Sequence, residues 1–387
     1  MQTNNLKSQF FLRKDITYLN FGAFGACPKP VLERYQRFQE EVEEDPTHFM
    51  LVKLPQYLNE TRTALANFLQ CSSDDVVFVT NPSYGVNIIA KSLNLKVGDE
   101  VLATDLEYGA CDRTWEYYCR RKGAVYVRQK IRFPITSKED FLSQFLEGIT
   151  PKTKLIFISQ ITSATGLRLP VHEICAFAKE RGILTFIDGA HAPGQLAVNL
   201  SELQADFYVG ACHKWMLAPK GSSFLYVKKE LQDSLDPLLI SWGYNSDHPS
   251  DSRFLDYHQL QGTKDYSAFL TVPTAINFMK ENDWDSFREV CKTITQKNAD
   301  RFCKLLNATP LSPVTDDFIA QLYSISLNVN SPEKLHDVLY EKYKIQIPIM
   351  LQGNTFYLRY SINAFNSSDD LDKLYEALEE ITKNKKM

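Results

Sequence analysis

The chain has 387 residues, of which 44% are hydrophobic and 23% are charged, and its formal net charge is −4. At roughly 150 residues per domain, this length predicts two or three domains. The apolar content suffices for a large core and excludes a disordered chain. The near balance of charge speaks against nucleic acid as the main partner.

The eight cysteines are scattered along the chain, without a Cys-x-x-Cys pair. This pattern indicates reduced thiols and predicts neither a disulfide framework nor a metal site. The first fifteen residues, MQTNNLKSQFFLRKD, are polar with one short apolar patch, which is typical of neither a signal peptide nor a membrane span. We therefore expect a cytoplasmic protein of enzyme size that has no membrane partner.

The first predicted elements are two amphipathic helices. One follows Pro30 and places Val31, Tyr35 and Phe38 on a single face. The second covers about residues 56–69 and has its own apolar stripe. Each of these helices has one face to bury against the rest of the protein.

Seven short apolar runs follow the helices, and amphipathic stretches of ten or more residues separate the first five. The runs cover residues 76–80, 100–104, 124–127, 154–159, 183–188, 206–211 and 223–228. This alternation predicts βαβ units, and so an α/β fold with a mostly parallel sheet that has helices on both faces. Ligands of such sheets bind beyond the carboxyl ends of the strands, where we expect the functional residues.

The pattern changes beyond Gly262. The elements predicted there are helices over 272–306 and 332–343, strands within 318–329 and 356–362, and a last helix from Ser368. We predict a large domain over 16–262, and a smaller α+β domain over 263–387 that the N-terminal segment 1–15 joins.

The strand at 76–80 leads into a helix start with features of a phosphate site. Asn81 is a good cap residue, and Pro82 suits the first helical position. The free N–H groups of the next turn and the Ser83 hydroxyl are placed to bind a phosphate at the positive end of the helix. Alone, the same pattern also fits an ordinary capped turn.

Two later strand ends carry ionisable residues. Asp188 ends the run 183–188, and its buried carboxylate needs a partner: a capped N–H, a metal ion or a protonated ring nitrogen. His191 lies three residues further on. Lys214 follows the strand 206–211; a partly desolvated lysine there has a lowered pKa and forms Schiff bases, whereas a solvated surface lysine is the alternative.

The three strand ends together match the needs of pyridoxal 5'-phosphate. The turn at Ser83 holds the phosphate, Asp188 keeps the pyridine nitrogen protonated, and Lys214 carries the aldehyde as an imine. Tyr108, at another strand end, is placed to stack on the ring. No metal ligand set is predicted.

With these residues considered, the chain resembles the class V aminotransferases, a family of fold-type I pyridoxal phosphate enzymes, and its isopenicillin N epimerase-like and cysteine desulfurase-like members in particular. The resemblance covers about residues 16–380. It rests on the segments YLNFGAFGACP (18–28), DLEYGAC (105–111), TSATGLRLPV (162–171), FIDGAHAPG (186–194), ACHKW (211–215) and QGTKD (261–265). It implies a large domain with a mostly parallel mixed sheet flanked by helices, plus a smaller α+β C-terminal domain.

The resemblance also implies residue roles. Lys214, Asp188 and Tyr108 are the expected catalytic residues, as the internal-aldimine lysine, the partner of the pyridine nitrogen and the ring-stacking group. His191 takes the place beside the phenolic oxygen of the cofactor. The other cofactor contacts that it implies are Ser83, Tyr84, His213 and Thr263, and the substrate contacts are Arg359, Asn20 and Ser163. Thr263 is expected to reach the phosphate of a neighbouring subunit, which implies a homodimer with shared active sites.

The implied reaction acts on an α-amino acid through an external aldimine and a quinonoid. We expect epimerase or carbon–sulfur lyase chemistry, with an aminotransferase as the alternative. A cysteine desulfurase is less expected, because the stretch 344–354 lacks the nucleophilic cysteine of that group and the nearest upstream cysteine is Cys303. An inactive cofactor-binding scaffold is disfavoured by the presence of Lys214, Asp188 and Arg359.

Overall fold

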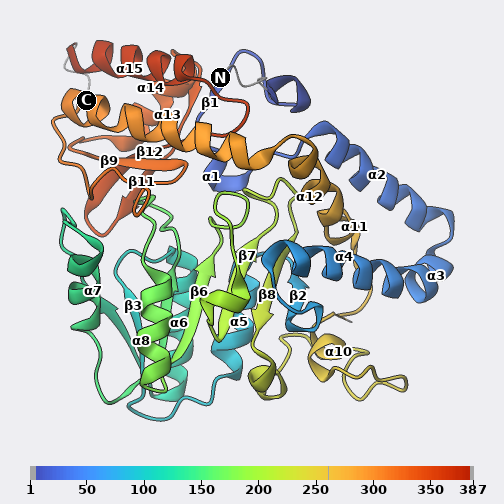
Figure 1. The fold of residues 1–387 in the computed structure, drawn as a ribbon. Coiled ribbons are helices and arrows are strands. Elements are labelled where there is room, and N and C mark those ends of the chain that lie inside the picture. Colours follow the sequence, from blue (N-terminus) through green and yellow to red (C-terminus); the bar gives the residue numbers. More distant parts are fainter. Residues whose placement is uncertain (1–5, 260, 384–387) are drawn as a thin grey trace.

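The computed structural model describes residues 6–259 and 261–383 and is built around a seven-stranded sheet (Figure 1). The sheet order is β2-β8-β7-β6-β5-β3-β4. Its strands are β2 (Val76–Val79), β3 (Glu100–Thr104), β4 (Val125–Gln129), β5 (Thr153–Ser159), β6 (Leu184–Gly189), β7 (Phe207–Ala211) and β8 (Ser223–Val227). Only β8 runs against its neighbours. The seven predicted strands and the mostly parallel sheet are confirmed.

Helices cover both faces of this sheet (Figure 1). Alternate residues of each strand pack on opposite sides, so that Leu155 and Phe157 of β5 face one core and Ile156 and Ile158 the other. One core includes α5 (Pro82–Ser92) and α6 (Gly109–Lys122), and the other includes α7 (Lys138–Leu146) and α8 (Val171–Glu180). Burial on both faces explains why these strands are continuous apolar runs in the sequence.

The two helices predicted first are α2 (Lys29–Glu44) and α4 (Leu54–Leu69). Their apolar faces pack against two short helices from much later in the chain, α11 (Ser267–Leu270) and α12 (Val272–Glu281). The predicted domain boundary at 262/263 stays a prediction. The helices α11 and α12 follow this boundary in the sequence but pack on α2 and α4, which precede it.

The C-terminal elements form a second, antiparallel sheet of the order β11-β12-β9, beside three helices (Figure 1). These elements are β9 (Leu322–Leu327), β11 (Ile349–Gln352), β12 (Thr355–Ser361), α13 (Trp284–Leu305), α14 (Pro332–Glu341) and α15 (Ser368–Lys383). The helices and two of the strands were predicted, but β11 was not. No described helix has the length and apolar character needed to cross a bilayer.

The start of the chain is tied to its end. A two-residue strand, β1 (Thr17–Tyr18), pairs in parallel with β10 (Ile345–Gln346), which the sequence also did not predict. Further upstream, the Leu6 N–H donates to the Ala364 carbonyl at 3.3 Å, and Phe10 packs edge-on against Phe365. These contacts place the next segment, α1 (Phe21–Phe24), close to β9 and β12, against Leu322 and Arg359.

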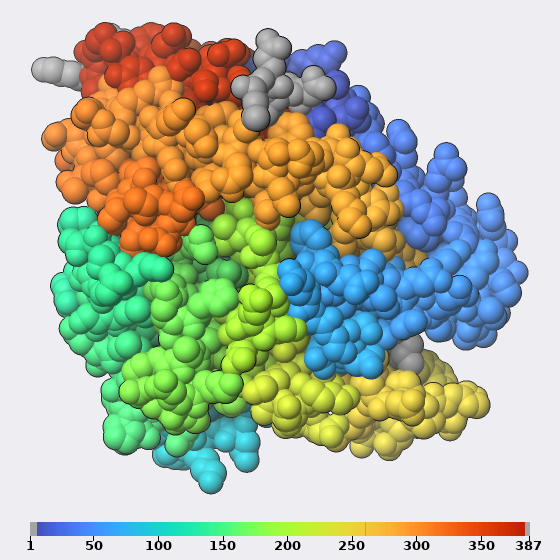
Figure 2. Space-filling model, in the orientation of Figure 1, coloured from blue at the N-terminus to red at the C-terminus, as the bar shows by residue number. Residues whose placement is uncertain are grey.

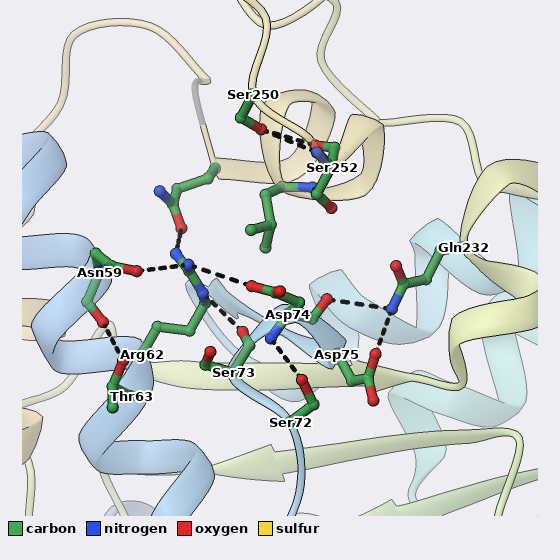
Figure 3. Close-up of polar contacts among 12 residues, drawn as sticks. Asn59, Arg62, Thr63, Ser72, Ser73, Asp74, Asp75, Gln232, Ser250 and Ser252 are labelled. Atoms are coloured by element: carbon green, nitrogen blue, oxygen red, sulfur yellow. Dashed lines mark hydrogen bonds and ion pairs between the residues drawn. The ribbon is translucent and has the colours of Figure 1, made fainter.

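A buried arginine joins three elements at the β2 edge of the large sheet (Figure 3). Arg62 of α4 donates to the carbonyl of Ser73 at 2.7 Å, to Asn59 Oδ1 at 2.9 Å and, in α10 (Arg253–Gln259), to Gln259 Oε1 at 2.9 Å. A carboxylate oxygen of Asp74 lies 3.7 Å from the guanidinium. The fork geometry of arginine thus fixes α4 and α10 to the turn that leads into β2.

Gly25 allows α1 to approach the loop that follows β7. Its φ of +65° lies in the left-handed region, and a Cβ atom there would be 2.2 Å from the His213 carbonyl oxygen and 3.0 Å from Lys214 Cα. Only a glycine permits this backbone-to-backbone contact.

We predict that Gly25→Ala destabilises the protein more than Gly98→Ala does. Gly98 also has a positive φ, of +83°, but nothing lies within 4 Å of a Cβ added there. Both variants incur a backbone strain of about 1–3 kcal/mol, and Gly25→Ala adds an overpacking cost of roughly 1–3 kcal/mol. Urea unfolding measures both losses; equal losses would contradict the close approach.

Candidate active site

A cavity of about 320 Å³ lies at the carboxyl ends of the central strands. It is lined by seven of the predicted site residues: Ser83, Tyr108, Ser163, Asp188, His191, His213 and Lys214. Ala23 and Phe24 of α1 contribute to its wall. The topology explains this gathering, because β3, β5, β6 and β7 are parallel and the segments that follow them meet at one edge of the sheet.

One end of the cavity is the start of α5. Asn81 Oδ1 accepts the N–H of Tyr84 at 2.9 Å, and Pro82 occupies the first turn, as predicted. Ser83 follows on the cavity wall. The positive end of the helix dipole and the hydroxyl of Ser83 make this end suited to an anion.

His213 adds a ring nitrogen to the cavity wall. Its Nδ1 lies 3.0 Å from the Ser222 carbonyl oxygen, which can only accept, so that Nδ1 carries a proton. Burial lowers the pKa of His213 to about 4, and Nε2 of the neutral ring is then an acceptor. Contact of Nε2 with a phosphate oxygen therefore requires a second proton, which a phosphate dianion would favour by raising that pKa.

Asp188 stands at the end of β6, and its side chain is buried. Its Oδ1 accepts the Ala190 N–H at 2.9 Å, and the thiol of Cys111 lies 3.6 Å from Oδ2. Burial raises the pKa of Asp188, against the effects of that N–H and of the cation Lys214. The carboxylate is under-solvated and gains from a nearby positive charge.

Lys214 extends from the loop after β7, and its Nζ lies 3.3 Å from His191 Nε2. Desolvation lowers its pKa to about 8, while Asp188 opposes this by favouring the charged form. A substantial fraction of the amine is therefore neutral near physiological pH, which is the state that attacks carbonyl carbons.

A hydrogen bond from Trp215 fixes the orientation of the His191 ring. The indole Nε1–H of Trp215 donates to His191 Nδ1 at 3.3 Å, so that in the neutral ring the proton is on Nε2. Burial lowers the pKa of His191 well below its usual value, which keeps the ring neutral. His191 thus presents a hydrogen-bond donor to the cavity, beside the neutral form of Lys214.

Glu107 is a residue of this region that the sequence analysis missed. It precedes Tyr108, is 1% exposed, and accepts hydrogen bonds from Thr104 Oγ1 at 2.6 Å and from both the N–H and the hydroxyl of Ser159, at 2.9 and 2.5 Å. Burial raises its pKa to about 8. It joins the turn that carries Tyr108 to the end of β5. The one feature of the sequence that could have drawn attention to Glu107 is its place directly before Tyr108, the predicted stacking residue.

Arg359 lies next to the cavity without lining it. It comes from β12, is 1% exposed, and donates from Nη1 to the Ser163 carbonyl. Burial lowers its pKa to about 10, so it remains a cation at neutral pH. Gly22 makes room for it, since a Cβ there would lie 3.4 Å from Nη2. Among the described residues, Arg359 Nε and Asn20 Oδ1 have no hydrogen-bond partner.

Besides Arg359 and Asn20, two predicted residues do not line the cavity of this single chain. Tyr84 offers its N–H to the Asn81 cap, and its ring packs beside the core that includes α5. Thr263 is exposed, after Gly262 with its φ of +89°. Their roles stay predictions.

We predict that competitive labelling of the cofactor-free protein with acetic anhydride gives Lys214 a reactivity midpoint near pH 8. Exposed lysines titrate near their usual value of about 10.4 and serve as internal controls. Asp188→Asn should lower the Lys214 midpoint further, because the charge that favours the ammonium form is removed. Mass spectrometry of the labelled peptides reads both values; a midpoint near 10 would contradict the desolvation of this amine.

Comparisons with known proteins identify the family. The family model "Aminotransferase class-V" matches residues 17–374. Isopenicillin N epimerase of Amycolatopsis lactamdurans is 31% identical over 98% of each chain, and L-cysteine desulfhydrase of Arabidopsis thaliana is 26% identical over 95% of this chain and 88% of its own length. A cysteine desulfurase structure from Thermococcus onnurineus NA1 has the same fold, with a TM-score of 0.82 at 19% identity over 99% of each chain. The chain belongs to the aminotransferase class-V family of pyridoxal phosphate enzymes.

Proposed function

We propose that this enzyme acts on an α-amino acid and catalyses an epimerisation or a carbon–sulfur lyase reaction. The observation that carries the proposal is one group of residues: a lysine with a pKa of about 8 that lies beside a histidine Nε2–H and is acted on by the charge of a buried aspartate, in a cavity bordered by a buried arginine. Such a set binds an amino acid by its carboxylate and handles a proton at its α-carbon.

The residues present fit pyridoxal phosphate. Asp188 is a buried carboxylate that gains from a protonated ring nitrogen, and the α5 start with Ser83 suits a phosphate. Tyr108 is 48% exposed at the cavity wall, which leaves its ring face open for stacking. When bound, the cofactor supplies an electron sink for negative charge at the substrate α-carbon.

Three side chains of the protein have separate roles in the proposed reaction. Lys214 takes and returns the α-proton, since its pKa of about 8 is close to the working pH. Arg359 holds the substrate carboxylate, and its unpartnered Nε is a donor available to it. His191 donates from Nε2 to an anionic oxygen, because its neutral tautomer is set by Trp215.

The epimerase and lyase outcomes are placed first because of the relatives. The chain aligns over nearly its whole length with an isopenicillin N epimerase and an L-cysteine desulfhydrase. An aminotransferase uses the same lysine and carboxylate contacts, so it remains the alternative. All three reactions begin with removal of the same proton.

Desulfuration through a protein persulfide has less support. Residues 344–354, which include β11, contain no cysteine. Cys303 is buried in α13, 3.2 Å from the Tyr323 hydroxyl, and burial raises its pKa. Cys111 is buried under Asp188, which raises its pKa further. Neither thiol has the lowered pKa of a nucleophilic cysteine.

The homodimer is part of the proposal. Thr263 lies in an exposed turn outside the cavity of its own chain, where it is free to reach a second copy. Sedimentation equilibrium measures the mass. A monomer that retains full cofactor affinity would contradict the shared site.

Product analysis tests the reaction class. The holoenzyme is incubated in D₂O with a panel of L- and D-amino acids, and each tube is assayed for enantiomer ratio, α-deuterium, keto acid, sulfide and ammonia. Inversion with deuterium incorporation and no keto acid indicates an epimerase; keto acid with released ammonia or sulfide indicates a lyase. Keto acid formed only with an added amino acceptor indicates the aminotransferase. No inversion, no α-deuterium and no keto acid with any amino acid of the panel would contradict the proposal.

We predict that Lys214→Ala abolishes the visible absorption band of the bound cofactor and lowers turnover by several orders of magnitude. Lys179→Ala, an exposed lysine of α8, is the matched control and should keep both. Absorption spectra and α-deuterium exchange are measured on the two variants side by side. A band retained in Lys214→Ala would remove this lysine from its assigned role.

We predict that Arg359→Ala lowers kcat/KM mainly by raising KM, while the cofactor stays bound. Loss of a buried bidentate contact costs about 2–5 kcal/mol, which is roughly 30-fold to several thousand-fold. Arg359→Lys keeps the positive charge but loses the two-pronged guanidinium, so its kcat/KM should lie between those of the wild-type enzyme and Arg359→Ala. Steady-state kinetics provide the values, and an unchanged KM in Arg359→Ala would exclude a carboxylate contact.

A further inference from the structure

A second cavity, of about 270 Å³, lies between the large sheet and the C-terminal elements. Its wall includes Gln195 from the segment after β6, Arg168 from the loop after β5, and Arg288 and Lys292 from α13. Figure 2 shows the corresponding seam, where orange residues of the C-terminal part lie against green residues from the middle of the chain. None of the catalytic groups proposed above lines this cavity.

The charges on its wall are of both signs. Lys292 pairs with Glu289 at 2.7 Å and with Asp316 at 2.8 Å. Arg168 differs, because the hydrogen bond of its guanidinium is to the backbone carbonyl of Asp316, at 3.0 Å, and among the described residues no carboxylate oxygen pairs with it. The guanidinium of Arg168 therefore has further N–H donors that can bind a carboxylate, and Glu289 and Asp316 lie on the same cavity wall.

We propose that this cavity is a second binding site, for a small zwitterion of the amino-acid type. The ligand's carboxylate binds the guanidinium of Arg168, and its ammonium group binds the carboxylates of Glu289 and Asp316. Glu289 and Asp316 share the single cation Lys292, which leaves one negative charge for the ligand's ammonium group beside the free guanidinium donors of Arg168. An anion without an ammonium group makes only one of these two contacts.

The cavity is hydrogen-bonded to the active site through Gln195. Its Oε1 accepts the Gln321 N–H at 2.6 Å, and its Nε2 donates to the His191 carbonyl at 2.7 Å. His191 is the residue whose ring lies against Lys214. A ligand that shifts Gln195 or Gln321 therefore acts on the position of His191.

A second connection runs through one loop. Arg168 and Ser163 lie in the same loop between β5 and α8, and the carbonyl of Ser163 accepts the hydrogen bond of Arg359. The Arg168 N–H is in turn fixed to the Phe318 carbonyl at 2.8 Å. Ligand binding at Arg168 is thus linked to the group proposed to hold the substrate carboxylate, a coupling that rests on the proposed function.

Calorimetry on the holoenzyme tests the site itself. The probe is N,N-dimethylglycine, a zwitterion whose tertiary amine cannot form an imine with the cofactor. We expect saturable 1:1 binding, an affinity at least tenfold weaker in Arg168→Gln, and an unchanged affinity in Arg181→Gln, an exposed arginine after α8. Ala197→Trp keeps every charge but fills the cavity, and should also abolish binding.

Two results would overturn the site. One is equal affinity in the wild-type protein, Arg168→Gln and Ala197→Trp, which would place the probe elsewhere. The other is binding of acetate as tight as that of N,N-dimethylglycine, which would exclude the ammonium contact. Melting temperatures close to the wild-type value ensure that a loss of binding is not a loss of fold.

The coupling is measured separately, from the visible band of the cofactor. Saturating N,N-dimethylglycine should shift the pH midpoint of that band in the wild-type protein. In Gln195→Leu the shift should be lost, although the probe still binds. An identical shift in both proteins would overturn the link through Gln195. Failure of the proposed function would look different: no turnover of any amino acid, with the cofactor band and the heat of probe binding intact.

Discussion

The partial desolvation of Lys214 is the constraint on which the rest of the site depends. A solvated lysine is almost fully protonated at neutral pH and is a poor nucleophile, so the fold must shield this amine and still keep it near polar partners. Asp188 limits the shift by supplying an opposite charge. The ring of His191 is neutral, which avoids charge repulsion with the Lys214 ammonium group. The pKa of each of these residues thus depends on the charge of its neighbours.

This arrangement requires close backbone packing around the lysine loop. The turn at Gly25 touches the backbone of His213, and that at Gly194 comes equally near to Trp215, where a Cβ would lie 2.2 Å from the carbonyl oxygen. These contacts pack backbone directly against the loop that carries Lys214. Two glycines far apart in the sequence therefore help to hold that loop in place.

Much of this could be predicted from the sequence, for a physical reason. Strands buried on both faces are continuous apolar runs, and parallel strands bring the residues after them to one edge, so Ser83, Asp188 and Lys214 could be grouped without coordinates. The sequence did not predict β10 and β11, because strands of two and four residues are too short to show a periodic pattern. It did not single out Glu107, because the burial of that side chain depends on Ser159, which lies far from it in the sequence.

The position of Arg359 has a consequence for how such enzymes diversify. The groups proposed to handle the proton follow strands of the large sheet, whereas Arg359 comes from a strand near the other end of the chain, in a sheet that has the half-exposed β11 as one edge. Substitutions along that edge can reshape what lies around a bound substrate without touching Lys214 or Asp188. With the proposed roles, the groups that set reactivity and those that set selectivity lie on separate parts of one polypeptide and can change independently.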